Sequence, residues 1–146
     1  MIARTEWAST EPSPDIYVGH SQSGHTIRLD ATKEHSEGPS PMEVVLVALC
    51  GCTSVDVVHI LQKKRQPLAH LTVSATAEQR TEPPNYFNKI QLVYAVTPEA
   101  GGQLSRKAVE DAVALSKDKY CSVSAMLEKS AEIEFVIEYV GGEPLP

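Results

Sequence analysis

Residues 38–66 read GPSPMEVVLVALCGCTSVDVVHILQKKRQ, and this stretch decides the fold. It contains no charged residue between Glu43 and Asp56, and residues 44–50 are all apolar. A helix that is apolar nearly all round belongs in the interior of a fold. The apolar run is also shorter than the roughly 18 residues that a membrane span needs. The stretch therefore predicts a long, buried central helix and no membrane span.

Both ends of this helix are marked in the sequence. Ser40 is suited to the N-cap, Pro41 to the first helical position, and Glu43 stands at the capping-box spacing from Ser40. Positive charge at residues 63–65 complements the negative end of the helix dipole, and Pro67 ends the helix. These signals predict one helix of about 24 residues, or roughly 36 Å.

The rest of the chain favours an α+β fold in a single domain, residues 1–146, a length typical of one domain. An antiparallel sheet is expected to pack against the central helix and a second, amphipathic helix at 104–119. Residues 120–126 fit either a turn or a further short helix. The predicted strands are 2–8, 15–20, 25–31, 68–80, 89–96 and 133–139, with a turn at 11–14.

A helix that is apolar on all sides needs cover on all sides, and short strands with one other helix supply little of it. A homodimer in which two such helices pack together would provide that cover. A glycine inside a helix lowers its stability, so Gly51 is expected to admit a close neighbour.

Charge and cysteine content restrict the function. A net charge of −6 argues against a general nucleic-acid or anionic-membrane binder, because phosphate contacts need clustered Lys and Arg. The N-terminal residues lack the apolar segment of a secretory signal. Three cysteines without an export signal indicate a reducing compartment, the cytoplasm, where a disulfide is transient and catalytic.

The cysteines are the candidate reactive groups. Cys50 and Cys52 point to different faces of the helix, so they cannot pair with each other, and Cys121 is the remaining cysteine. Cys50 fits a buried hydrophobic role, whereas Cys52 lies where the helix becomes polar. A reactive thiol needs positive charge or donated hydrogen bonds, and Arg4 and Arg28 on the N-terminal strands are the candidates.

Two thiols far apart in sequence suit peroxide reduction. One thiolate attacks the O–O bond and becomes a sulfenic acid, and the second thiol condenses with it to a disulfide that an external dithiol reduces.

Two segments carry a family resemblance. The segment SPMEVVLVALCGC, ending at Cys52 and followed by TSVDVV, resembles the central-helix motif of the OsmC/Ohr proteins (osmotically inducible protein C and organic hydroperoxide resistance protein). The later segment AVALSKDKYCSVSAML, around Cys121, resembles the second-cysteine segment of the same family. The resemblance spans roughly residues 25–140.

The resemblance implies an intertwined homodimer of α+β subunits with the active site at the dimer interface. It implies thiol-dependent reduction of organic hydroperoxides, with Cys52 as the peroxidatic residue and Cys121 as the resolving residue. A lipoyl or other small dithiol would be the reductant, and no cofactor is implied.

The sequence departs from the peroxidase branch at two places. That branch carries Glu directly after the motif proline, where this chain has Met42, and the glutamate comes one residue later as Glu43. That branch also has an N-terminal arginine that holds the thiolate; residues 15–21 contain none, and Arg28 lies on the next strand. The alternative is therefore a weakly catalytic or non-catalytic dimeric module that binds a small apolar or thiol ligand at the interface.

Other polar residues favour structural interpretations. His59 is expected to be a surface or core histidine, and Asp56 a hydrogen-bonded residue at the helix edge whose charge would raise a neighbouring thiol's pKa. A zinc site built from Cys50, Cys52, Cys121 and a histidine lacks paired C-x-x-C spacing, so no metal is expected.

Overall fold

The computed structural model describes residues 1–9 and 13–146, which form two compact units, Met1–Leu46 and Val47–Pro146. The boundary falls within the long helix α1 (Pro41–Lys63). The predicted turn at 11–14 lies partly outside the described residues. A single domain spanning 1–146 stays a prediction.

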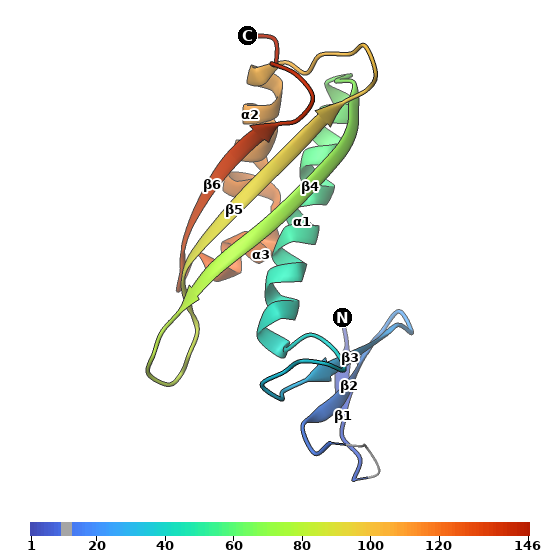
Figure 1. Ribbon diagram of the computed structural model, residues 1–146, viewed down its shortest axis with the longest axis vertical. Coiled ribbons are helices and arrows are strands. Elements are labelled where there is room, and N and C mark those ends of the chain that lie inside the picture. The colour runs from blue at the N-terminus through green and yellow to red at the C-terminus, as the bar shows by residue number, and fades with distance from the viewer. Residues whose placement is uncertain (10–12) are drawn as a thin grey trace. The chain divides into compact units, whose positions relative to one another are not determined.

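The first unit is built on an antiparallel sheet of β1 (Ala3–Glu6), β2 (Ile16–Ser21) and β3 (Thr26–Asp30), in that order (Figure 1). The predicted hairpin of the second and third strands is confirmed, with Ile16 opposite Asp30. Gly38 is needed where the chain approaches α1, because a Cβ there would collide with the backbone of Arg28.

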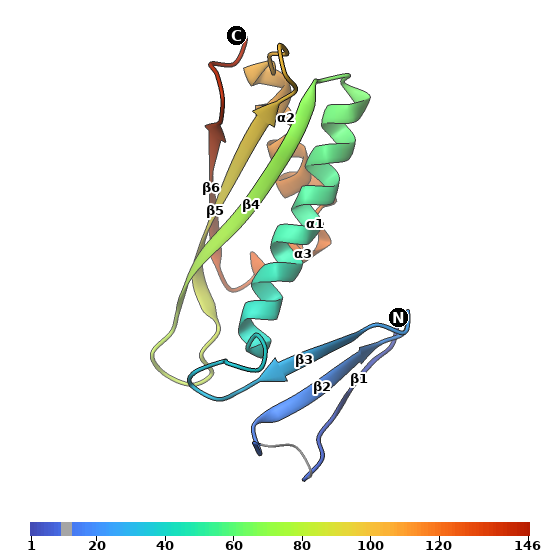
Figure 2. The ribbon, with the colours of Figure 1, turned by 45° about the vertical axis from the view of Figure 1, so that its right-hand side comes forward.

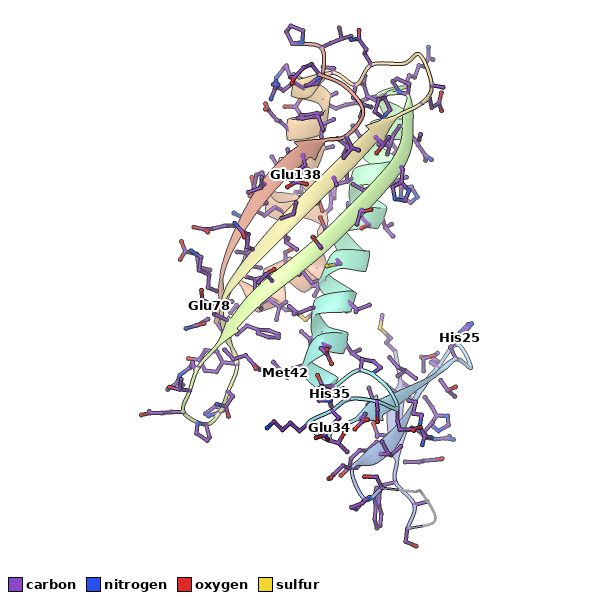
Figure 3. All side chains as sticks on the ribbon, in the orientation of Figure 1. His25, Glu34, His35, Met42, Glu78 and Glu138 are labelled. Atoms are coloured by element: carbon purple, nitrogen blue, oxygen red, sulfur yellow. The ribbon has the colours of Figure 1, made fainter. Side chains whose placement is uncertain are left out.

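The second unit contains the sheet β4-β5-β6, made of β4 (Leu68–Gln79), β5 (Phe87–Pro98) and β6 (Glu132–Tyr139). The helices lie on one face of this sheet (Figure 2). Charged residues such as Glu78 and Glu138 occupy exposed positions on its outer strands (Figure 3). The buried face of β5, the central strand, presents Ile90, Leu92 and Tyr94.

The α+β prediction and its element order are confirmed, with two differences. β6 pairs with β5 in parallel, not antiparallel, because the helical connection between them carries the chain back to the starting end of the sheet. The predicted helix 104–119 is also divided: α2 (Arg106–Leu115) is followed by a π-helical turn (Ser116–Tyr120) and then by α3 (Ser122–Leu127).

The predicted ends of α1 are confirmed. The side chain of Ser40 accepts a hydrogen bond from the Glu43 amide at 3.2 Å, and Glu43 accepts one from the Ser40 amide at 2.7 Å. This reciprocal pair is a capping box. At the other end the helix stops at Lys63, before Pro67.

Within one chain, α1 is buried on one side. The buried stripe repeats every four residues, as Leu49, Thr53, Val57 and Leu61. A second stripe with the same spacing faces outward: Val47 is 66% exposed, Val55 is 55% exposed, and Gly51 lies between them. Apart from its two chain neighbours and the backbone of its own helix, a Cβ on Gly51 would meet no atom of the described residues within 4 Å. The sequence predicts a helix buried on all sides and a close neighbour at Gly51. Among the described residues of a single chain, neither expectation is met.

By length and composition α1 passes the test for a membrane-crossing helix, with a mean hydropathy of 2.2. The core helix of a soluble protein can have the same length and composition. Here the buried stripe packs against the chain's own core.

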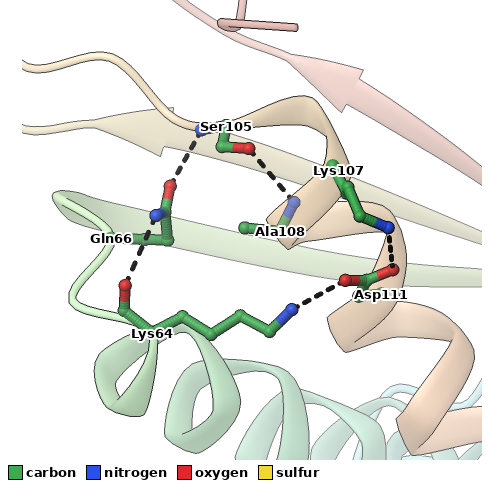
Figure 4. Close-up of polar contacts among 6 residues, drawn as sticks. All are labelled: Lys64, Gln66, Ser105, Lys107, Ala108 and Asp111. Carbon is green, nitrogen blue, oxygen red and sulfur yellow. Dashed lines mark hydrogen bonds and ion pairs between the residues drawn. The ribbon is translucent and has the colours of Figure 1, made fainter.

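Polar contacts tie the end of α1 to the start of α2 (Figure 4). Gln66 accepts a hydrogen bond from the Ser105 amide at 2.8 Å, and Ser105 caps α2 by accepting one from Ala108 at 3.3 Å. Lys64 reaches Asp111 on α2 at 2.8 Å. These contacts hold the start of α2 against the end of α1. They therefore also help to position the π-helical turn that follows α2.

Replacing Leu49 with alanine is expected to lower the free energy of unfolding by about 2–5 kcal/mol, because it leaves a cavity under the buried stripe. Urea denaturation followed by circular dichroism measures the change. Leu115→Ala on α2 is the control, since that side chain is 38% exposed and should lose much less. Equal losses for the two variants would contradict the assignment of the stripe to the core.

Candidate functional site

The two cysteines singled out by the sequence, Cys52 and Cys121, lie together in the second unit. Cys52 is on α1, and Cys121 is the N-cap residue of α3. The sulfur atoms and a carboxylate oxygen of Asp56 all lie within 4.8 Å of one another. Cys52 and Asp56 are half-buried, whereas Cys121 is buried, and both thiols are free.

The π-helical turn positions Cys121. The Cys121 amide donates to the carbonyl oxygen of Ser116, five residues earlier, at 2.8 Å. Its sulfur accepts a hydrogen bond from the Ser124 amide at 3.4 Å. The wider turn therefore swings the chain out of α2 and directs the thiol toward α1. Such π-helical insertions are often found at functional sites.

A chain of buried hydroxyl groups leads to Asp56. Tyr94 Oη lies 2.7 Å from Thr53 Oγ1, which lies 2.9 Å from Ser116 Oγ. Ser116 Oγ donates to Asp56 Oδ2 at 3.0 Å. Because an ionised carboxylate can only accept, and each hydroxyl has one proton, the direction of every bond is set. Tyr94 donates to Thr53, Thr53 to Ser116, and Ser116 to Asp56.

Burial controls the electrostatics of this site. Burial raises the pKa of the Cys121 thiol; hydrogen bonds from Ser124 act against this, and the neighbouring Cys52 raises it further. Burial also raises the pKa of Tyr94 to about 12, so Tyr94 keeps its proton and serves as the first donor of the chain. The carboxylate of Asp56 lies beside the two sulfurs.

Cys50 is not part of this cluster. Burial raises the pKa of its thiol, which favours the neutral form. Cys50 is half-buried, and its role as a small hydrophobic side chain stays a prediction.

The other predicted site residues belong to the first unit. Glu43 is engaged in the capping box with Ser40. Arg28 Nε lies 3.5 Å from a carboxylate oxygen of Glu37, and Arg4 pairs with Glu6 at 3.0 Å. Their roles toward the thiols stay predictions.

Sequence reasoning assigned no role to Tyr94, Thr53 or Ser116. One signal was present: Thr53 is a polar residue at the centre of a stripe whose other members are apolar. Asp56 was expected to be hydrogen-bonded at the helix edge, and this is confirmed by the Ser116 contact. His59 is exposed, in agreement with a surface histidine.

The cluster also offers ligand atoms for a metal. Two thiolates and a carboxylate form a donor set that Zn²⁺ accepts, although a structural zinc site uses four ligands. The set differs from the one weighed in the sequence, because Asp56 joins the cysteines and Cys50 does not.

Comparisons with known proteins cover most of the chain. The family model described as "OsmC-like protein" matches residues 33–136. Protein YhfA of Escherichia coli (strain K12) is 44% identical over 140 residues, which are 96% of this chain and 98% of that protein. A solved structure described as structural genomics is 42% identical with a TM-score of 0.82, over 96% of this chain and 98% of the other.

A crystal structure from Legionella pneumophila, of an organic hydroperoxide resistance protein OsmC, is 13% identical with a TM-score of 0.65. It covers 94% of this chain and 95% of its own. At this identity the similarity shows the fold alone.

Replacing Thr53 with valine is expected to lower the free energy of unfolding by about 1–3 kcal/mol, because Tyr94 and Ser116 each lose a buried partner. Thr76→Val, at an exposed position of β4, is the matched control and should change stability little. Chemical denaturation of both variants gives the comparison, and an unchanged Thr53→Val protein would contradict the hydroxyl chain.

Proposed function

The chain belongs to the OsmC-like protein family, and we propose that it reduces organic hydroperoxides with thiols, with Cys52 as the peroxidatic residue and Cys121 as the resolving residue. The observation that carries this proposal is the placement of the two sulfurs within 4.8 Å of each other although they are distant in sequence. The Legionella pneumophila protein, described as an organic hydroperoxide resistance protein and predicted redox protein, supports the choice of substrate class.

The reaction would proceed in three steps. The Cys52 thiolate attacks a peroxide oxygen, so the O–O bond breaks, an alcohol leaves, and Cys52 becomes a sulfenic acid. The Cys121 thiol then attacks that sulfur, forming the S–S bond and releasing water. A small dithiol of the lipoyl type reduces the disulfide by thiol exchange and is itself oxidised to a cyclic disulfide.

The geometry suits the second step. A disulfide bond is about 2.05 Å long, so the sulfurs must approach from their present separation. We propose that the Cys52 side chain, which is half-buried on a regular helix, makes this approach. The reducing cytoplasm is the compartment in which we place this cycle, since a standing disulfide would block it.

We also propose a homodimer, in agreement with the exposed stripe of α1. Val47 and Val55 are large apolar residues left open in one chain, with Gly51 between them. A second copy of α1 crossing at Gly51 would cover both valines, and the missing Cβ would let the helix backbones come close. Arg28 and Glu43 remain our candidates for groups that support the thiolate in that assembly.

One observation favours the second candidate function, a dimeric module that binds a small apolar or thiol ligand. Burial raises the pKa of the Cys121 thiol, and a carboxylate oxygen of Asp56 lies within 4.8 Å of both sulfurs. A Cys121 thiol kept protonated in this way would attack a Cys52 sulfenic acid slowly.

One equivalent of an organic hydroperoxide, such as cumene hydroperoxide, is expected to lower the intact mass of the reduced protein by about two units, through the disulfide. Cys121→Ser should instead gain about 16 units as a sulfenic acid, and Cys52→Ser should stay unchanged. Cys50→Ser is the control and should behave as the wild type. An unchanged wild-type mass, with no dithiol-dependent turnover above that of Cys52→Ser, would favour the binding module.

Val55→Glu is expected to weaken the dimer, because it places a charge in the apolar stripe of α1. Sedimentation analysis over a range of protein concentrations should show a shift to monomer. Val140→Glu makes the same change at a residue that is 46% exposed outside α1, and should leave the assembly intact. A wild-type protein that is monomeric at all concentrations would refute the proposed dimer.

A further inference from the structure

Disulfide formation requires a proton transfer that the two sulfurs cannot perform alone. When Cys121 attacks the Cys52 sulfenic acid, the S–O bond breaks and the S–S bond forms. The Cys121 sulfur is oxidised, the sulfenic sulfur is reduced, and the thiol proton must reach the departing hydroxyl so that water leaves. Burial holds that proton on Cys121 by raising its pKa. The step therefore needs a group that accepts a proton on one side and delivers it on the other.

Asp56 lies where such a group is needed. Its carboxylate and the two sulfurs are mutually within 4.8 Å, so a single side chain neighbours both the donor of the proton and the atom that loses the hydroxyl. It is one helical turn beyond Cys52 on α1, so it shares the orientation of that residue.

The carboxylate is also held in place. Asp56 Oδ2 accepts the Ser116 hydroxyl at 3.0 Å, and Ser116 is itself the acceptor of Thr53. The Ser116 hydroxyl donates its one proton to Asp56, and this hydrogen bond holds the carboxylate in position. The remaining lone pairs of the carboxylate can still accept a proton from the Cys121 sulfur. Ser116, Thr53 and Tyr94 are all at least 99% buried, which shields these bonds from competing water.

We propose that Asp56 is the proton shuttle of the disulfide-forming step, taking the proton from Cys121 and passing it to the hydroxyl that leaves Cys52, with Ser116 as its positioning residue. The proposal rests on the two-cysteine peroxidase function and assigns a group to one of its steps. The oxidant is the organic hydroperoxide that formed the sulfenic acid, and no further reactant is required.

This role has a consequence that a structural role does not share. In this role Asp56 takes no part in the first step, because the attack of Cys52 on the peroxide does not involve the Cys121 proton. The same carboxylate accelerates the second step by general base and acid catalysis. Removing its charge should therefore slow the second step and leave the first step unchanged.

Asp56→Asn tests this in single-turnover reactions with one equivalent of cumene hydroperoxide, quenched at intervals and read by intact mass. We expect sulfenic acid to form as fast as in the wild type, and disulfide formation to slow by about 100-fold, so that sulfenic acid accumulates. Glu138→Gln removes a negative charge from an exposed residue of β6 and should leave both steps unchanged.

The pH profile provides a second readout. Without the carboxylate, Cys121 must lose its proton to solvent, so disulfide formation in Asp56→Asn should rise about tenfold per pH unit below the thiol pKa. Ser116→Ala keeps the carboxylate but removes its donor. It should slow the step by a smaller factor while keeping the flatter wild-type profile, and it serves as the test if Asp56→Asn does not fold.

Disulfide formation at the wild-type rate in Asp56→Asn would overturn the proposal. An equal slowing of both steps would also overturn it, because that is the result of a purely structural defect. Failure of the peroxidase function itself looks different: the wild type would then form neither sulfenic acid nor disulfide, and the shuttle would fall with it.

Discussion

The hydrogen bond of Thr53 with its buried neighbours is the constraint around which the second unit is arranged. Thr53 occupies the centre of the stripe that α1 buries, where a hydroxyl without partners would be destabilising. Its partners come from two other elements, Tyr94 from β5 and Ser116 from the turn after α2. A single polar atom thus fixes a helix, a strand and a turn relative to one another.

The same constraint sets the geometry of the cysteines. Ser116 reaches Thr53 only if α2 ends where it does, and its carbonyl oxygen then receives the Cys121 amide. Ser116 therefore links Cys121 to α1, because its backbone bonds Cys121 and its side chain bonds Thr53. Fully satisfied polar networks in a core make one arrangement much more favourable than its alternatives. The separation of the two sulfurs therefore follows from core packing.

Much of the fold could be predicted from the sequence because its signals are local. The capping box at Ser40, the stop at Pro67 and the alternation along β5 each depend on neighbours within a few residues. The parallel pairing of β6 and the division of the helix at Ser116 could not be predicted in this way. Both depend on how distant segments pack, and the sequence around Ser116 continues a helical pattern without a break.

The residues of the candidate site could likewise be predicted only in part. Cys52 and Cys121 could be chosen because cysteine is rare in this chain and its chemistry is specific. Tyr94, Thr53 and Ser116 are common residue types whose importance comes from contact across 41 and 63 positions of sequence. Asp56 was recognised as a charge near Cys52, but its nearness to Cys121 depends on the π-helical turn.

The carboxylate beside the sulfurs points to a division of electrostatic tasks. A peroxidatic thiol reacts as a thiolate, which a cation stabilises and a carboxylate opposes. A resolving thiol that is kept protonated by burial benefits from a nearby base. Because both thiols share one cluster, no single charge serves both steps. In the proposed dimer a cation would stabilise the thiolate, with Arg4 and Arg28 as the candidates that the sequence offers, and Asp56 would serve the step that releases water.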